Sequence, residues 1–182
     1  MKNTMIISAF PACGKTYLCK NKNKLKFKYQ GKRICYSFID SNSSKFKGHN
    51  GWEKEYVDYI EENIGKVDFI LTAQHEGVML ELKRRNIPFV TVTPESGERY
   101  ESSKRQKVHD LTKQQWFGRF MLRDNSHIRE PETWIRNMME NYDTWVSEEY
   151  LSEYNSIGMF SLRAEQYLSD IIEDLYWIKE NR

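Results

Sequence analysis

The sequence predicts an α/β fold in which helices cover both faces of a five-stranded, mostly parallel sheet. Short apolar segments of high β-propensity alternate along the chain with segments whose apolar residues recur at helical spacing. The segment 34–39 is apolar on both faces, as an interior strand of a parallel sheet is. The 182 residues suit one domain with a full core. We therefore expect a single domain over 1–182, with an insertion at about 97–130.

The predicted strands are short and are closed by turn-forming or polar residues. A buried strand begins the stretch from Thr4 to Thr16 and is followed by a tight loop and the start of a helix. Three more strands are bounded in the same way, and a fifth is weaker. The later segments are 34–39, 67–72, 89–93 and 156–160.

The predicted helices follow from apolar spacing and from end signals. The first begins near Gly14 and ends in the early twenties, the second has an apolar stripe from Trp52 to Ile64, and a short one covers 76–85. One helix is expected within 96–130, and Pro131 opens another whose apolar face extends to Val146. Ser161 is a candidate cap for the last helix. Its inward-facing residues are Leu168, Ile171, Ile172, Leu175 and Ile178.

Residues Ala9 to Thr16 fit the P-loop pattern, with alanine in place of the usual first glycine. Such a loop wraps a triphosphate with its backbone N–H groups, and Gly14 allows close approach because it has no Cβ. Lys15 would place a charge between the β- and γ-phosphates, and Thr16 would offer its hydroxyl to Mg²⁺. The predicted cofactors are therefore ATP and Mg²⁺; the alternative is an ordinary strand–turn–helix. The cofactor-binding candidates are Ala9, Pro11, Ala12, Cys13, Gly14, Lys15, Thr16 and Tyr17.

Asp40 is the best candidate for catalysis besides Lys15. It ends the second predicted strand, which we expect to neighbour the P-loop strand, and it opens the polar run 40–44. Its carboxylate could deprotonate an acceptor hydroxyl or, with Thr16, hold the metal and its water shell. The alternative is an aspartate that caps a loop. The metal candidates are therefore Thr16 and Asp40.

The acceptor side has weaker signals. The third strand lacks the carboxylate that many P-loop NTPases place at its end, and Gln74 and His75 stand there instead. Either could contact a water, an acceptor base or a phosphate. The substrate-binding candidates are Asp40, Ser41, Gln74, His75 and Glu95.

The predicted insertion is rich in basic residues and suggests a mobile lid. Arginines on a closing lid stabilise the charge of a transferring phosphoryl group and exclude water. Arg119 and Arg123 are four residues apart and would share a helix face, so both are catalytic candidates. A solvated basic helix is the alternative. The basic residues considered are Arg99, Arg105, Lys113, Arg119, Arg123 and Arg129.

Bulk properties point to a cytoplasmic protein. The net charge is only +2 with 30% charged residues, which does not by itself favour nucleic acid or membrane. Three cysteines without metal spacing read as reduced thiols, and no apolar run approaches a membrane span. The stretch 20–33 is locally basic. It is either a solvated connection or a patch for the phosphates of a long substrate.

The chain resembles P-loop kinases of the nucleoside and nucleotide kinase type, in Ala9–Thr16, Asp40 and the Arg-rich insertion. In the run 40–46 and in Pro94-Glu95 it is similar to small phage-encoded nucleotide kinase-like proteins. The resemblance implies a three-layer α/β/α sandwich with strand order 2-3-1-4-5. It also implies an acceptor region after strand two, a lid before the last strand and action in a host cytoplasm. Polynucleotide kinases also resemble it at Asp40.

Three functions stay open at this point. The first is transfer of the γ-phosphate of ATP to a nucleoside or nucleoside monophosphate. The second is transfer of this phosphate to a hydroxyl of DNA or another polynucleotide, including a modified base. The third is a non-catalytic nucleotide-binding module that grips a partner. The sequence 72–75 departs from the Asp-Gly-x-Pro-Arg run of adenylate kinases, which leaves the acceptor open. The oligomeric state also stays open.

Overall fold

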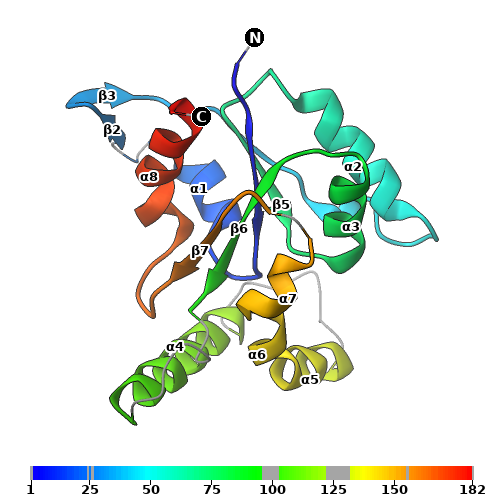
Figure 1. Ribbon diagram of the computed structural model, residues 1–182, viewed down its shortest axis with the longest axis vertical. Coiled ribbons are helices and arrows are strands. Elements are labelled where there is room, and N and C mark those ends of the chain that lie inside the picture. Colours follow the sequence, from blue (N-terminus) through cyan, green and yellow to red (C-terminus); the bar gives the residue numbers. More distant parts are fainter. Residues whose placement is uncertain are drawn as a thin grey trace.

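The computed structural model describes residues 2–23, 25, 27–95, 103–121, 132–154 and 156–181. A five-stranded sheet in the order β4-β5-β1-β6-β7 forms its centre, and all four pairings are parallel (Figure 1). The prediction of an α/β fold with a five-stranded parallel sheet is therefore confirmed. The sheet strands are β1 (Met5–Ala9), β4 (Phe38–Asp40), β5 (Phe69–Ala73), β6 (Phe89–Pro94) and β7 (Met159–Leu162).

The predicted strand 34–39 is divided, which corrects the sequence interpretation. Strands β2 (Phe27–Tyr29) and β3 (Lys32–Ile34) form a separate antiparallel hairpin. The chain then turns, because the Ser37 N–H donates to the Asp68 carboxylate at 2.8 Å and only the residues after it enter the sheet. The sheet order β4-β5-β1-β6-β7 does not read 2-3-1-4-5, because the hairpin strands β2 and β3 take two numbers before the second strand of the sheet.

Alternation of side chains along the strands produces two hydrophobic cores. Odd-numbered residues of β1 such as Ile7 pack with α1 (Lys15–Asn21) and α8 (Leu168–Glu180). Even-numbered Ile6 packs with α2 (Trp52–Asn63) and α3 (Glu76–Arg84) on the opposite face. The sheet is thus covered on both faces, as the period of two in a strand requires. No helix in the described part of the chain is long and apolar enough to cross a membrane.

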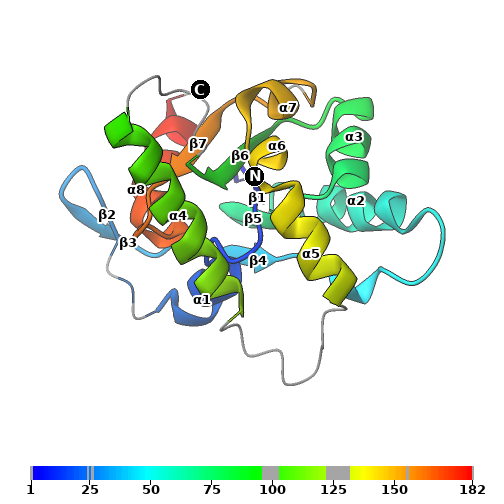
Figure 2. The same cartoon turned by 90° about the horizontal axis from the view of Figure 1, so that it is seen from below.

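Four further helices lie beyond the carboxyl ends of the strands (Figure 2). The single helix predicted after Pro131 is interrupted at Asn141, whose backbone N–H and side-chain amide both donate to the Asn137 carbonyl, at 3.0 and 2.9 Å. Asn42 caps a short 3₁₀ turn, η1 (Ser43–Lys45), after β4. The four helices are α4 (Ser103–Met121), α5 (Glu132–Glu140), α6 (Tyr142–Trp145) and α7 (Glu148–Ser152).

The last strand and helix begin later than predicted. The weak strand expected at 156–160 is β7, and Ser161 lies within it rather than at a helix cap. Helix α8 begins at Leu168, where the Asp170 carboxylate accepts the Tyr167 N–H at 2.7 Å. A carboxylate in the first turn satisfies a backbone donor and suits the helix dipole, so it replaces the expected serine.

The described part of the predicted insertion includes helix α4, which packs against the core. Trp116 and Phe120 of α4 are 3% and 2% exposed and belong to the same core as Phe10 and Val92. These two rings anchor the helix in this structure, and the predicted mobility of the insertion stays a prediction. Arg99, Arg123 and Arg129 lie outside the described residues, and the side chain of Arg105 is not described either.

A row of buried hydroxyl groups crosses the centre of the sheet on the α2–α3 face. Ser8 of β1 is in register with Thr72 on one side and Thr91 on the other, and Thr93 follows on β6. All four side chains are fully buried, yet the hydroxyl oxygens of Ser8, Thr72 and Thr93 have no hydrogen-bond partner among the described residues. An unsatisfied buried hydroxyl destabilises the folded state.

Replacing Thr72 by valine, which has the same shape, is expected to raise the free energy of unfolding by about 1 kcal/mol. Thr91→Val is the matched control, because the Thr91 hydroxyl faces the Gly158 carbonyl at 3.5 Å and its loss offers less gain. Urea titration of both variants gives the comparison. A Thr72→Val variant less stable than the parent would show that the hydroxyl is satisfied, for example by a buried water.

Candidate functional site

The loop between β1 and α1 has the backbone of an anion cradle. Gly14 has φ 95° and ψ 15°, and Ala12 has φ 60°, so two left-handed residues flank Cys13. Alternation of right- and left-handed residues turns successive N–H groups toward one side of a loop. A left-handed alanine costs about 1–2 kcal/mol, so the surrounding structure must enforce the conformation. The loop follows the central strand of the sheet.

Lys15 lies over this loop in the structure. Its Nζ donates to the carbonyls of Ala9 at 2.5 Å and Phe10 at 3.1 Å. No side chain caps the start of α1, and no residue of its own first turn is acidic. Burial raises the pKa of the Cys13 thiol to about 12. Cys13 is therefore a neutral, apolar filler of the loop.

Thr16 and Asp40 meet, as the metal prediction requires. The Thr16 hydroxyl donates to the Asp40 carboxylate at 2.8 Å. The expectation that their strands are neighbours is wrong, because β5 lies between β4 and β1. The contact forms instead because α1 packs beside β4 and presents its first turn to the end of that strand. The pair thus places a hydroxyl and a carboxylate beside the loop from Ala9 to Thr16, which we name the phosphate loop after its sequence pattern.

Ser41, a predicted acceptor residue, is buried in the core. It is 2% exposed, and its hydroxyl donates to the Leu71 carbonyl at 2.8 Å and lies 2.8 Å from the Tyr56 hydroxyl. The strand alternation explains this, since Asp40 and Ser41 point to opposite faces of the sheet. Ser41 therefore fastens β4 to β5 and α2 and has no free face for a ligand.

Gln74 and His75 lie at the end of β5, with different surroundings. The Gln74 N–H donates to the Ala9 carbonyl at 3.3 Å, and its side-chain Nε2 donates to the Trp145 carbonyl at 3.1 Å. Its Oε1 is buried without a partner among the described residues. The His75 ring stands edge-on to Trp52 at 5.1 Å. Partial burial, and then the nearby Lys47 charge, lower the pKa of His75, so it is neutral near pH 7.

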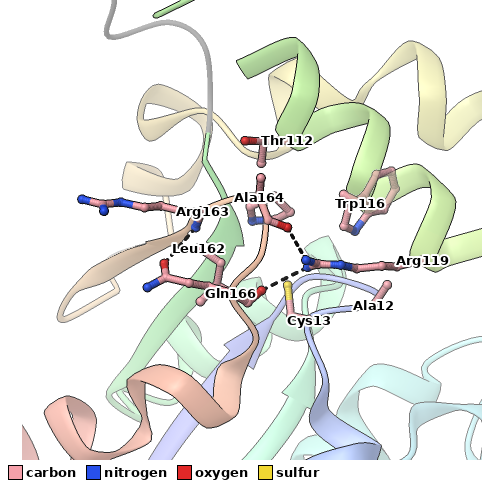
Figure 3. A pocket seen from close by; sticks show the side chains of 10 residues that line it. Ala12, Cys13, Thr112, Trp116, Arg119, Leu162, Arg163, Ala164 and Gln166 are labelled. Atoms are coloured by element: carbon pink, nitrogen blue, oxygen red, sulfur yellow. Dashed lines mark hydrogen bonds between the residues drawn. The ribbon is translucent and has the colours of Figure 1, made fainter. Parts of the chain in front are cut away.

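A pocket adjoins the phosphate loop on the side of β7 (Figure 3). The space inside it is about 10 Å³, which is room for about one water molecule. The Arg119 guanidinium lies in it, stacked 4.1 Å from the centre of the Tyr167 ring, and donates to the carbonyls of Gln166 at 3.0 Å and of Ala164. The lining residues are Ala12, Cys13, Pro94, Thr112, Trp116, Arg119, Leu162, Arg163, Ala164 and Gln166.

The pocket contains residues that sequence reasoning missed. The loop 163–167 was not a candidate, although it follows the carboxyl end of a parallel strand, where ligands commonly bind. Trp116 was assigned only to a helix. Glu95, a predicted acceptor residue, follows β6, and its backbone N–H donates to the Leu162 carbonyl at 2.9 Å. Lys113 pairs with Asp143 at 2.6 Å, so this lid candidate is engaged within the protein.

The basic stretch lies away from the phosphate loop. The Lys28 N–H donates to Glu173 at 2.6 Å, and the Tyr29 ring contacts Tyr176 at 5.1 Å, so the hairpin packs along α8. Leu168, at the start of α8, donates to the Cys13 carbonyl of the loop. Eight residues separate it from Tyr176, which is about 12 Å along the helix. The described part of the hairpin therefore does not line the phosphate loop; Lys24 and Lys26 lie outside the described residues.

The candidate site brings together four features at the carboxyl end of β1. They are a loop shaped for an anion, the Lys15 ammonium, the Thr16–Asp40 pair and the Arg119 pocket. The shape of the loop and the Lys15 charge are suited to an anion such as a phosphate. No protein-family model, curated protein or solved structure matches the chain.

Proposed function

We propose that the protein is an ATP- and Mg²⁺-dependent phosphotransferase with the three-layer sandwich of a P-loop kinase. Its acceptor is a hydroxyl or phosphate of a nucleoside or nucleoside monophosphate. The observation that carries the proposal is the Thr16–Asp40 hydrogen bond of 2.8 Å beside the Gly14–Lys15–Thr16 turn. A phosphate loop alone fixes a nucleotide, whereas a carboxylate beside it supplies a group for the acceptor or the metal.

The phosphates would lie in the loop from Ala9 to Thr16. The Lys15 ammonium, which now donates to two loop carbonyls, would exchange them for phosphate oxygens. The Thr16 hydroxyl and Asp40 carboxylate fit Mg²⁺, because both offer hard oxygen atoms already within hydrogen-bond distance. When bound, Mg²⁺ would neutralise phosphate charge. Since no cluster of three acidic, histidine or cysteine side chains occurs among the described residues, phosphates and waters would complete its shell.

The nucleobase would enter the Arg119 pocket. The space inside the pocket is about 10 Å³, room for about one water molecule, so Arg119 would have to move for a ring to enter. The carbonyls of Ala164 and Gln166 are acceptors for an exocyclic amino group, and the Arg119 plane can stack on a ring as it now stacks on Tyr167. This arrangement supports adenine, which carries such an amino group.

Transfer to a hydroxyl acceptor would use Asp40 as the base. The acceptor oxygen forms a bond to the γ-phosphorus, its proton passes to the Asp40 carboxylate, and the bond from the γ-phosphorus to the bridging oxygen breaks to release ADP. A monophosphate acceptor needs no such proton transfer, and Asp40 would then act through the metal and its waters. Arg119 would stabilise charge on the phosphates if it leaves its present carbonyl partners.

A polynucleotide acceptor is the second candidate. Lys28, Lys32 and Arg33 are exposed on the hairpin, which favours contact with a phosphate backbone. Because this hairpin packs about 12 Å along α8 from the loop, only a long acceptor could contact both. The third candidate, a non-catalytic nucleotide-binding module, is supported by the absence of a carboxylate at Gln74 and His75.

The test is transfer of label from γ-labelled ATP, with Mg²⁺, to a panel of nucleosides, nucleoside monophosphates and DNA. We expect label on a small acceptor. Label on DNA alone would support the second candidate, and ATP binding in calorimetry without transfer to any acceptor would support the third. A protein that neither binds ATP·Mg²⁺ nor transfers phosphate would contradict the proposed function.

A further inference from the structure

Trp116 makes a direct contact with the backbone of the phosphate loop. Its indole Nε1 donates to the Pro11 carbonyl at 2.7 Å, although the two residues are 105 positions apart in the sequence. Trp116 is 3% exposed, and the hydrogen bond is partly buried. A partly buried hydrogen bond restrains the carbonyl more firmly than a fully exposed one does.

The indole itself has little freedom to move. Its ring lies 5.2 Å from Phe10, 4.9 Å from Tyr142 and 5.5 Å from Phe120, between centroids. Aromatic pairs at these distances favour defined relative orientations. The N–H therefore points at Pro11 because the packing of three rings fixes the plane of the indole.

The position of the Pro11 carbonyl determines the direction of the next N–H. The peptide unit between Pro11 and Ala12 is planar and trans, as no cis bond occurs among the described residues. In a trans peptide the carbonyl and the N–H point in opposite directions, so a carbonyl turned toward α4 turns the Ala12 N–H away from it. The same contact supports Ala12 in its left-handed conformation, with φ 60°.

The same helix also holds the loop on the other side of the pocket. Arg119 is one turn beyond Trp116 and donates to the carbonyls of Ala164 and Gln166 (Figure 3). Residues three apart on a helix share a face, so α4 presents both groups to the pocket. Helix α4 thus connects the phosphate loop to the β7–α8 loop.

We propose that Trp116 is a positioning residue, which holds the phosphate loop in its anion-binding shape and so sets the affinity for the phosphates of a nucleotide. This inference rests on the proposed function, because it assumes that the loop binds phosphates. Trp116 touches the loop backbone and acts through it. A preformed loop binds more tightly because less conformational entropy is lost on binding.

The test is Trp116→Phe, which removes the N–H and keeps an aromatic ring in the core. We expect the Kd for ATP·Mg²⁺, and for inorganic triphosphate with Mg²⁺, to rise by about tenfold in calorimetry. Both probes should weaken alike, because the loop contacts phosphates and not the base. Trp177→Phe is the matched control, since Trp177 is 57% exposed on α8 and its loss should leave both values unchanged.

Two further measurements separate the possible failures. If the parent protein binds neither probe, the proposed function fails. If it binds both, and a folded Trp116→Phe variant binds them equally well below its Tm, the indole has only a structural role and the inference is overturned. If the variant does not fold, hydrogen exchange of the indole N–H is measured in the parent protein. We expect the Trp116 indole proton to exchange more slowly with triphosphate bound. Exchange as fast as that of the Trp177 indole proton would overturn the inference.

Discussion

Replacing Lys15 with alanine is expected to weaken ATP·Mg²⁺ binding and to lower turnover by about 10²–10³-fold. The reason is local: the Lys15 ammonium lies over the phosphate loop, where it donates to the backbone carbonyls of Ala9 and Phe10. A compact cation at this place neutralises charge that develops in phosphoryl transfer. Calorimetry with ATP·Mg²⁺ and the labelled-ATP assay measure the two effects.

Lys20→Ala is the control for the Lys15 variant. Lys20 is exposed in the last turn of the same helix, at the end away from the loop, so its loss changes net charge equally without touching the site. We expect the Lys20 variant to bind and turn over ATP as the parent does. Equal behaviour of Lys15→Ala and the parent would contradict the assignment of the phosphate loop.

Asp40→Asn is expected to lower turnover by about 10²–10⁴-fold while ATP binding changes little. The substitution keeps the size of the side chain and an oxygen that can still accept the Thr16 hydroxyl, now 2.8 Å away. It removes the charge and the ability to take a proton. Steady-state kinetics on the acceptor found in the screen, with thermal unfolding as a check of the fold, measures the effect.

The two roles open to Asp40 give different secondary results. If Asp40 is the base, the acidic limb of the pH–rate profile should disappear in the variant. If it holds the shell of the metal, the Mg²⁺ concentration for half-maximal rate should rise instead. Asp174→Asn, an exposed carboxylate on α8, is the control and should change neither. An Asp40→Asn variant with the turnover of the parent but lower thermal stability would show that Asp40 only caps a loop.

The short-range features of the site were predictable because neighbouring residues determine them. Gly14 adopts φ 95° where the pattern needs a residue without a Cβ, and α1 begins at Lys15 as expected. The parallel sheet was also predictable, since short apolar strand segments alternate along the chain with segments of helical periodicity. By contrast, the stretch 34–39 has the composition of one strand, and only the long-range bonds from Ser37 to Asp68 divide it.

The contacts between distant segments required the tertiary structure. Sequence alone determined which groups the phosphate loop contains and that Asp40 ends a strand. The tertiary structure brings the Thr16 hydroxyl to the Asp40 carboxylate although β5 lies between β1 and β4. It also buries the Ser41 hydroxyl against the Leu71 carbonyl. It also decided that α4 is packed onto the loop through Trp116. The physical reason is that these contacts join residues 24 to 105 positions apart, and packing of whole elements, rather than local propensity, sets their partners.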